Sequence, residues 1–560
     1  MSEFDVHAML DNAIAHYNDG RVQEVVQLSN KILKISPNNP DALNLLGITT
    51  FQMGQLDTAT KLIRKAVQNA PGRPSFLNNL ANVLMEQNRV DEALKIYYRV
   101  LGINPELAEV RHNIGCLLQR QGRLKEAIKF YQSAIDINPT YVEAYTNLGS
   151  LLQEQYKYQV AVEIYNRALK VNPNIPEIHN NIGIILQIQG IVNQSSQYMK
   201  EAVACHQRAL TIDAQFPAAE SNLGLALQKL GNIEEAISHY ERALKIDPKF
   251  QNAHYNLSFV ELQRGHFKSG WYHHTARYGR DVDDIVPFCQ SGIDLENKRV
   301  LIRKEQGLGD ELFFLRFMPR LKSLGTWLAY DTDVRLIDLI STLSSVDFVT
   351  DDATSLNNID FTFMLGDLPR LLGMDDVEKI PLPISLQIPS ESLTSVQNLL
   401  SEIGPPPYVG IAWWAGVRND IISYRKADFS QLAEFFSGLE CTVLILQRDA
   451  DAVGIKAFSE VLGRQAYDFT HYNQDLNKMA ALLKLIDHHV TVSNTNVHLR
   501  AAVGRPSSVL IPIYTVARIW IDQEQSSSWY PGTIIYRQSP ELSWDHSFEK
   551  LQKDLQLTSA

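Results

Sequence analysis

The chain of 560 residues has few cysteines, no basic block and no long apolar run. Its four cysteines lie far apart, without the paired spacing of a zinc site or a redox motif, so we expect no metal and free, buried thiols. A net charge of −11 without clustered Lys and Arg disfavours nucleic acid as a partner. No segment has the roughly eighteen apolar residues that span a bilayer, and the N-terminus lacks a basic segment followed by an apolar one. We therefore expect a cytoplasmic protein, without a membrane span, that binds proteins or small molecules.

The first half of the chain repeats with a period of 34 residues. Prolines keep this period at Pro37, Pro71, Pro105, Pro139 and Pro173, small residues keep it at Ala59, Ala93, Ala127 and Ala161, and turn positions keep it at Gly20, Gly54, Asn88, Gly122, Tyr156 and Gly190. A small residue lets two helices approach, the turn position tolerates a left-handed backbone, and proline stops the second helix. The pattern resembles tetratricopeptide repeats, helical hairpins that stack into a superhelix.

The period slips by seven residues after Gly190, because the next turn position is Gly231. Two extra helical turns inserted near residues 191–200 would explain the slip. The repeats fade after Gly265, and all seven tryptophans of the chain follow them, which marks a change of composition. We therefore expect a repeat domain over residues 1–280.

Asparagine recurs at one position of the first helix in six successive repeats, at Asn79, Asn113, Asn147, Asn181, Asn222 and Asn256. We call this set the asparagine ladder. Stacked hairpins would line these amides along one surface, where each can donate to and accept from the backbone of an extended peptide. The same asparagines can instead serve the repeat itself. The ladder thus predicts an acceptor-peptide groove, with a purely structural role as the alternative.

The second half of the chain alternates strand and helix patterns. Candidate strands lie at 298–304, 327–330, 347–350 and 361–365, and again at 408–413, 441–446, 489–493 and 508–513. A proline-containing stretch at 380–389 separates the two series and predicts a linker. The pattern favours two doubly wound, Rossmann-like α/β lobes, at 281–390 and 391–560, that face a cleft.

Three loops follow candidate strands at the edge where ligands bind such sheets. The first contains Gly307 and Gly309, whose missing side chains let a substrate approach, and ends at Asp310 before a predicted helix at 311–324. Asp310 is either a helix cap or a catalytic base. The second loop begins at Trp413, a candidate donor-binding residue, and carries cations that could hold a diphosphate or simply be solvated, Arg418, Arg425 and Lys426.

The third loop runs from a strand into a predicted helix at 497–503 through Asn494, Thr495, Asn496 and His498. Amides at a helix N-terminus favour a phosphate, whereas an N-cap and a packed histidine are the alternative interpretation. The glycine-rich loops match neither a Walker motif nor a dinucleotide motif, so ATPase and dehydrogenase activities have no support.

These residues together resemble bacterial tetratricopeptide glycosyltransferases over most of 298–545. The resemblance rests on the motifs EQGLGD at 305–310, WAG followed by RND at 418–420, SNT and HL followed by AVGRP at 493–506, and SWYP followed by YRQ at 528–538. The second half is similar to heptosyltransferases, which implies two lobes of the B-type glycosyltransferase fold. The repeats look like those of O-linked N-acetylglucosamine transferases of proteins.

The resemblance implies a role for each loop. Asp310 would be the general base, Asn494, Thr495 and His498 would hold the donor's phosphates and sugar, and Arg425 or Lys426 would neutralise the leaving diphosphate. Such a site needs neither a metal nor a cofactor, because the nucleotide sugar is the donor substrate. The chain departs from the family where Asn494 replaces a common Asp and where Arg500-Ala501 replaces Ala-Gly.

The expected function is therefore inverting transfer of a sugar to Ser or Thr of a protein bound by the repeats, such as flagellin or another surface protein. Hexosyl, heptosyl and nonulosonyl donors stay open, as does the nucleotide. The alternatives are transfer to a lipid or glycan acceptor, or a repeat scaffold without catalysis.

Overall fold

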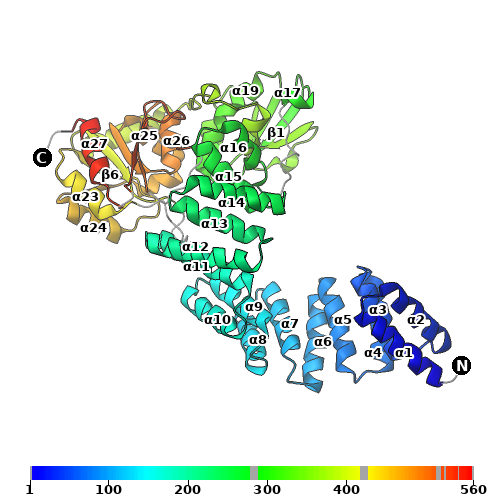
Figure 1. Cartoon of the computed structure of the whole chain (residues 1–560). Coiled ribbons are helices and arrows are strands. Elements are labelled where there is room, and N and C mark those ends of the chain that lie inside the picture. The colour runs from blue at the N-terminus through cyan, green and yellow to red at the C-terminus, as the bar shows by residue number, and fades with distance from the viewer. Residues whose placement is uncertain are drawn as a thin grey trace. The chain divides into compact units, whose positions relative to one another are not determined.

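The computed structural model describes residues 3–277, 288–415, 427–512, 519–521, 525–539 and 542–557. Two compact units divide the chain at residues 185 and 186, and we call them the N-terminal unit and the C-terminal unit. Figure 1 shows paired helices from blue to cyan in the first, and helices with two sheets from green to red in the second. None of the helices among these described residues is both long and apolar enough to cross a membrane.

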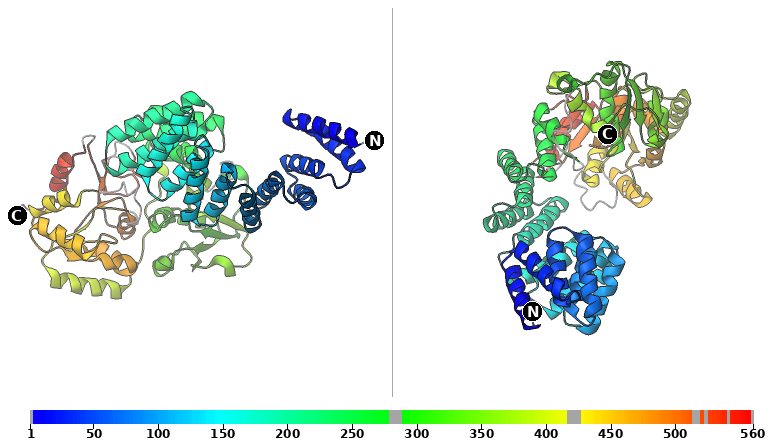
Figure 2. Two further views of the ribbon diagram at one scale, coloured as in Figure 1. Left: turned by 90° about the horizontal axis from the view of Figure 1, so that it is seen from below. Right: turned by 90° about the vertical axis from the view of Figure 1, so that its right-hand side faces the viewer.

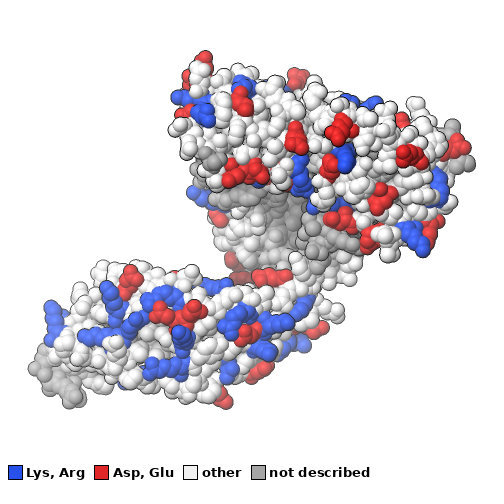
Figure 3. Space-filling view, turned by 180° about the vertical axis from the view of Figure 1, so that it is seen from behind, with Lys and Arg blue, Asp and Glu red and all other residues white. Residues whose placement is uncertain are grey.

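Antiparallel helix pairs build the N-terminal unit, and Figure 2 shows the same pairwise stacking from two further directions. The helices are α1 (Glu3–Asn18), α2 (Val22–Ile35), α3 (Pro40–Gln52), α4 (Leu56–Asn69), α5 (Pro74–Glu86), α6 (Val90–Ile103), α7 (Ala108–Arg120), α8 (Leu124–Ile137), α9 (Val142–Glu154) and α10 (Tyr158–Val171). The unit ends within α11 (Pro176–Val192). On the face drawn in Figure 3, its Lys and Arg are interspersed with Asp and Glu.

The repeat marks do what the sequence predicts. Each second helix ends two residues before its proline, as α2 does at Ile35 before Pro37. The turn residues adopt the left-handed backbone, including Asn88 at φ 57° and Tyr156 at φ 61°. The small residues in register are fully buried between paired helices. These features confirm a helical solenoid of tetratricopeptide hairpins.

One of the predicted turn positions is wrong. Gly190 lies inside α11, and the left-handed residue of that hairpin is Gln194 at φ 49°. The slip in period arises because α11 and α12 (Ser196–Ile212) each have 17 residues, whereas α9 has 13 and α10 has 14. Gly190 is needed for packing, since a Cβ there would lie 2.9 Å from Met199 Cε.

The C-terminal unit begins with the last hairpins of the solenoid, α12, α13 (Pro217–Lys229), α14 (Ile233–Ile246), α15 (Gln251–Gln263) and α16 (Phe267–His274). A buried ion cluster joins the end of these helices to the first sheet. Arg277 donates to Glu305 Oε2 at 3.0 Å and to Asp367 Oδ1 at 2.8 Å. Burial opposes the charged form, but the carboxylates of Asp367 and Glu305 raise the pKa of Arg277 above its ordinary value.

Two parallel sheets follow. The first has the order β3-β2-β1-β4 and consists of β1 (Arg299–Arg303), β2 (Trp327–Asp331), β3 (Phe348–Thr350) and β4 (Phe361–Met364). The second has the order β10-β9-β8-β5-β6-β7 and consists of β5 (Tyr408–Ala412), β6 (Thr442–Ile445), β7 (Tyr467–Asp468), β8 (His488–Val492), β9 (Ser508–Ile511) and β10 (Ile534–Arg537). All eight candidate strands are found, whereas the sequence did not predict β7 or β10.

Helices separate these strands: α17 (Phe288–Ser291), α18 (Leu308–Phe314), α19 (Met318–Lys322), α20 (Ile337–Ile340), α21 (Leu368–Leu371), α22 (Ser390–Ile403), α23 (Phe429–Ser437), α24 (Ala452–Leu462), α25 (Leu476–Leu485), α26 (Thr495–Ala502) and α27 (Asp545–Leu555). The single helix predicted at 311–324 is wrong. It begins three residues earlier and breaks at the 3₁₀ turn Leu315–Phe317, because Pro319 cannot donate its amide to a continuing helix. Residues 380–389 carry no regular structure, and α22 begins directly after them.

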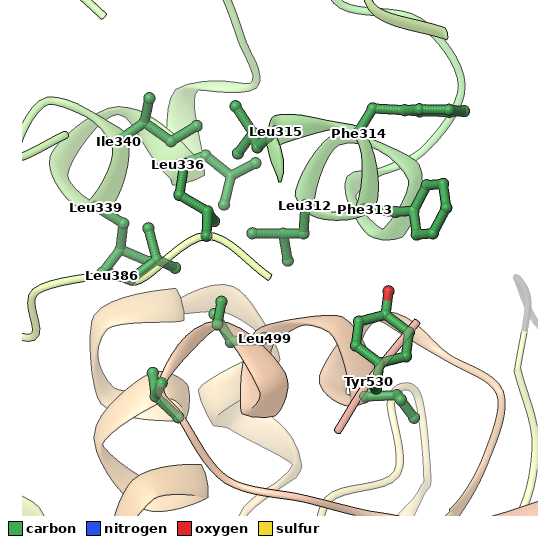
Figure 4. Close-up of a cluster of buried hydrophobic side chains, with 14 of the residues drawn as sticks. Leu312, Phe313, Phe314, Leu315, Leu336, Leu339, Ile340, Leu386, Leu499 and Tyr530 are labelled. Atoms are coloured by element: carbon green, nitrogen blue, oxygen red, sulfur yellow. The ribbon is translucent and has the colours of Figure 1, made fainter. Parts of the chain in front are cut away.

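Side chains from around both sheets share one hydrophobic core, and α18 packs against α26 within it. Figure 4 shows Leu312 and Phe313 of α18 facing Leu499 of α26 and Tyr530. A backbone hydrogen bond of 2.9 Å from Leu386 to the Ala502 carbonyl adds a polar link. The loops that precede α18 and α26 are thereby brought together.

Candidate functional site

A cavity of about 540 Å³ lies in the C-terminal unit where the carboxyl ends of strands from both sheets meet. Its lining comes from the segments after β1, β2, β5, β6, β7, β8 and β9, together with two residues of α15. Every predicted residue of the first and third loops lines it: Gly307, Gly309, Asp310, Asn494, Thr495, Asn496 and His498. Parallel strands present their following loops at one edge, which explains why segments almost two hundred residues apart converge.

The first loop reaches the cavity through a tight backbone. Gln306 adopts the left-handed conformation at φ 62°, and Gly307 is the N-cap of α18 without a side-chain cap. Asp310 is therefore not the cap residue; it lies half-buried in the first turn of α18, where the helix dipole favours a carboxylate. A Cβ on Gly307 would meet open space, whereas one on Gly309 would lie 3.2 Å from His498 Cδ2.

The third loop caps its own helix. Asn494 is the N-cap of α26, and its side chain accepts a hydrogen bond of 3.0 Å from the Asn496 amide. Its Nδ2 donates to Thr491 Oγ1 at 2.8 Å, and the Val497 amide donates to the Asn494 carbonyl at 3.2 Å. Two of the first amides of α26 thus already have partners. The features that still favour an anion are the helix dipole and the part of the helix N-terminus at Thr495.

The ring of His498 is oriented by a contact with Tyr530. Its Nδ1 lies at hydrogen-bond distance from the hydroxyl of Tyr530, a buried residue that the resemblance included without a role. The Arg316 guanidinium lies 4.7 Å from the centre of the Tyr530 ring and donates to the Trp529 carbonyl at 2.8 Å. Burial lowers the pKa of Arg316. With Nδ1 directed at Tyr530, the Nε2 edge of His498 faces Gly309 across the junction of α18 and α26.

Three cationic residues of the described chain line the cavity, namely Lys304, Arg335 and Arg448. Arg335 forms a bidentate pair with Asp333, at 2.9 and 2.8 Å, and this pair lowers the pKa of Asp333 to about 2. Arg448 Nε lies 3.6 Å from Asp449 Oδ2. The predicted Arg425 and Lys426, with Arg418, lie outside the described residues. Trp414, rather than the predicted Trp413, lines the cavity, because the Trp413 ring stacks on Phe458.

Glu311 is a lining residue that the sequence did not single out. Its Oε2 accepts hydrogen bonds from the Tyr330 hydroxyl at 2.7 Å and from Thr332 Oγ1 at 2.8 Å. Burial raises the pKa of Glu311 despite these donors. The sequence shows Glu311 directly after Asp310, and this position could have drawn attention to it. The sequence does not show that the helix turns the Glu311 side chain inward. The neighbouring carboxyl groups of Asp310 and Glu311 thus both line this cavity, and their surroundings differ.

The last full hairpin of the solenoid also contributes to the cavity. Tyr255 and Phe259 of α15 line it, with their rings 4.8 Å apart in a T-shaped arrangement. Tyr255 is 40% exposed, whereas Phe259 is nearly buried at 9%. An aromatic face from the repeats therefore stands at the same cavity as Asp310 and His498.

The asparagine ladder is half-buried, and five of its six amide nitrogens donate to side chains of the described residues. Asn79 donates to Asn44 Oδ1 at 3.0 Å, and Asn113 donates to Asn82 Oδ1 at 3.3 Å. The later members donate in the same way: Asn147 to His112, Asn181 to Tyr165 and Asn256 to Ser221, while the backbone carbonyl of Asn222 accepts from Gln187. These bonds favour the structural interpretation, and peptide binding by the ladder stays a prediction.

Family models for the tetratricopeptide repeat match residues 73–140, 118–180 and 217–250. The chain therefore contains tetratricopeptide repeats, which imply a surface for protein–protein interaction. Protein FlbA of Caulobacter vibrioides is 26% identical over 303 residues, which cover 49% of this chain and 50% of that protein. The chain thus spans about half the length of this curated relative.

Solved structures with similarity include the Cut9–Hcn1 hetero-tetramer of the APC/C, at 19% identity and a TM-score of 0.36, covering 49% of this chain and 54% of that one. The C-terminal part of a repeat protein from Cytophaga hutchinsonii has 16% identity and a TM-score of 0.36, with coverages of 44% and 97%. YrrB, described as a repeat protein with an unusual peptide-binding site, has 22% identity and a TM-score of 0.28, with coverages of 35% and 96%.

Proposed function

We propose that the chain is a protein O-glycosyltransferase with two Rossmann-like lobes of the B type, which transfers a sugar from a nucleotide donor to Ser or Thr of a protein bound by its repeats. The observation that carries the proposal is the convergence of Asp310, His498 and the N-terminus of α26 on one cavity at the strand ends. Ligands of parallel α/β sheets bind at this edge.

The chemistry of the lining suits a nucleoside diphosphate sugar. Lys304, Arg335 and Arg448 bring cationic donors to a lining that also holds carboxylates, and the α26 dipole favours an anion at Thr495. Charge develops on the diphosphate as it leaves, and groups fixed around the cavity stabilise that charge without rearranging. No metal or cofactor is required by this scheme.

Asp310 is the general base of the proposed reaction. It accepts the proton of the acceptor hydroxyl while the hydroxyl oxygen attacks the anomeric carbon and the bond to the diphosphate breaks. Direct displacement inverts the configuration at that carbon. Glu311 is assigned no proton transfer, because its Oε2 accepts hydrogen bonds from the Tyr330 hydroxyl and from Thr332 Oγ1.

The repeats would recruit the acceptor protein, flagellin or another surface protein. Tyr255 and Phe259 support this role, because they connect the repeat helices to the wall of the cavity. Aromatic rings give an extended peptide a rigid apolar contact next to the reacting hydroxyl.

A thermal-shift screen of the full chain against UDP, ADP, GDP, CDP and CMP and their sugar conjugates tests the proposal. A ligand that binds only the native state raises the unfolding midpoint, so the true donor nucleotide is expected to stand out from the others. The shift should shrink in His498→Ala and persist in Asn79→Ala, a matched change in the ladder. If no nucleotide raises the midpoint of the wild-type chain, the proposal fails.

A repeat scaffold without catalysis is the second candidate. The matches to family models favour it, because all three lie in the repeats. The partial capping of α26 by Asn494 points the same way, since it occupies amides that a phosphate would use. The scaffold predicts partner binding that is unchanged by Asp310→Asn and by any nucleotide.

A further inference from the structure

A cysteine and a histidine face each other in the N-terminal unit, far in sequence from the cavity of the second unit. Both lie one turn apart on α7, with Cys116 Sγ 3.6 Å from His112 Nε2. The other nitrogen of the ring, Nδ1, lies 3.3 Å from both Asn113 Oδ1 and the Tyr141 hydroxyl. A thiol next to an imidazole that is oriented by a third group is the arrangement of an activated nucleophile.

The surroundings stabilise a thiolate. Asn147 Nδ2 lies 3.4 Å from Cys116 Sγ and 2.8 Å from His112 Nε2, so one amide of the ladder bridges the pair. The other titratable groups that interact with the pair among the described residues are Tyr97 of α6, Tyr131 of α8 and Glu143 of α9.

These contacts outweigh burial. Burial by itself raises the pKa of a thiol, yet the hydrogen bond and charge of His112 bring the pKa of Cys116 below its ordinary value. Burial likewise lowers the pKa of a histidine, and the bond to Cys116 raises that of His112 instead. Cys205 and Cys441 show the opposite case, because burial raises the pKa of each.

The pair lies next to a groove of the solenoid. A cavity of about 540 Å³ in the N-terminal unit is lined by Asn113 and Tyr141, the two residues that contact His112 Nδ1. Cys116 itself is half-buried. The sulfur is therefore partly exposed and close to this cavity without lining it, and the rings of Tyr131 and Tyr141 pack against the imidazole.

We propose that Cys116, activated by His112, is a modification site on α7 that small hydroperoxides oxidise. The thiolate attacks the terminal oxygen of the hydroperoxide, a sulfur–oxygen bond forms and the oxygen–oxygen bond breaks. The departing alkoxide or hydroxide takes the proton of His112 Nε2, and Cys116 becomes a sulfenic acid. The sulfur loses two electrons and the peroxide gains them. This role is independent of sugar transfer.

Limiting hydrogen peroxide on the full chain, followed by dimedone trapping and peptide mass spectrometry, tests the site. Cys116 is expected to be labelled about tenfold or more faster than Cys205 and Cys441 at neutral pH, since the thiolate is the reacting species. His112→Gln should lower its labelling to that of the other two thiols. Equal labelling of the three in the wild type, or unchanged labelling in folded His112→Gln, overturns the proposal.

The pH profile of the wild type decides the matter if His112→Gln does not fold. Alkylation by iodoacetamide is expected to reach half its maximal rate at Cys116 below pH ~8.5, the ordinary thiol pKa. The profiles of Cys205 and Cys441 should lie above that value. A midpoint for Cys116 at or above those of the other two contradicts the proposal, whatever the fate of the variant.

Discussion

The asparagine ladder and the strand-end loops are both sets of polar residues that the sequence marks as functional, yet the structure treats them differently. Members of the ladder donate to side chains of neighbouring helices, as Asn79 does to Asn44. The strand-end loops instead turn Asp310 and His498 toward one cavity. A polar residue that recurs with the repeat can be explained by stacking, whereas polar residues without a period that meet in space call for a ligand.

The largest difference between the two sets should appear in transfer activity. Asp310→Asn keeps the shape of the side chain but removes the base, and we expect sugar transfer to fall by about 100- to 10,000-fold. Nucleotide binding should remain. Glu311→Gln serves as the neighbouring control and should lower stability more than rate, because its carboxylate is held by Tyr330 and Thr332. A larger loss of rate in Glu311→Gln than in Asp310→Asn would assign the role of general base to Glu311.

The second prediction concerns the buried ion cluster that joins the last repeat helices to the first sheet. Arg277→Met leaves Glu305 and Asp367 buried without their cation, which we expect to lower the free energy of unfolding of the C-terminal unit by about 3–5 kcal/mol. Arg123→Met in the exposed pair with Glu126 should leave stability unchanged. Equal denaturation midpoints for the two variants would show that the cluster does not anchor the sheet.

A smaller effect separates the two glycines of the first loop. Gly309→Ala places a Cβ 3.2 Å from His498 Cδ2 and 3.5 Å from Thr495 Oγ1, so the His498 ring must give way slightly, at an expected cost of about 1–3 kcal/mol. Gly307→Ala meets open space at the cavity and should alter nucleotide affinity more than stability. Thermal denaturation and nucleotide titration of both variants would measure the contrast, and identical profiles would contradict it.

The smallest expected effect belongs to the ladder. Asn79→Ala removes the bond to Asn44, and we expect a loss of about 1 kcal/mol in the stability of the N-terminal unit. The double variant with Asn44→Ala should lose less than the sum of the two single changes, because they share that bond. A strictly additive cycle together with weaker binding of the partner protein would restore the peptide-binding interpretation.

Much of the fold could be predicted because its signals are local. The proline spacing marks the ends of α2, α4, α6, α8 and α10, and apolar runs mark eight strands. The prediction of a turn at Gly190 was wrong because glycine occurs at sites of close packing as well as in turns. Only the contact with Met199 shows that Gly190 is needed for packing. Tyr530 and Glu311 could not be placed from the sequence, since their roles depend on contacts with His498 and Tyr330 that only the folded chain creates.

Hydrogen exchange of the full chain, with and without the nucleotide sugar that shifts the melting point most, tests the central claim most directly. We expect slower exchange in peptides covering residues 304–311 and 493–498 on binding, and unchanged exchange across the asparagine ladder. Protection confined to the repeats, or none in either loop at saturating nucleotide, would contradict the assignment of the cavity as a nucleotide-sugar site.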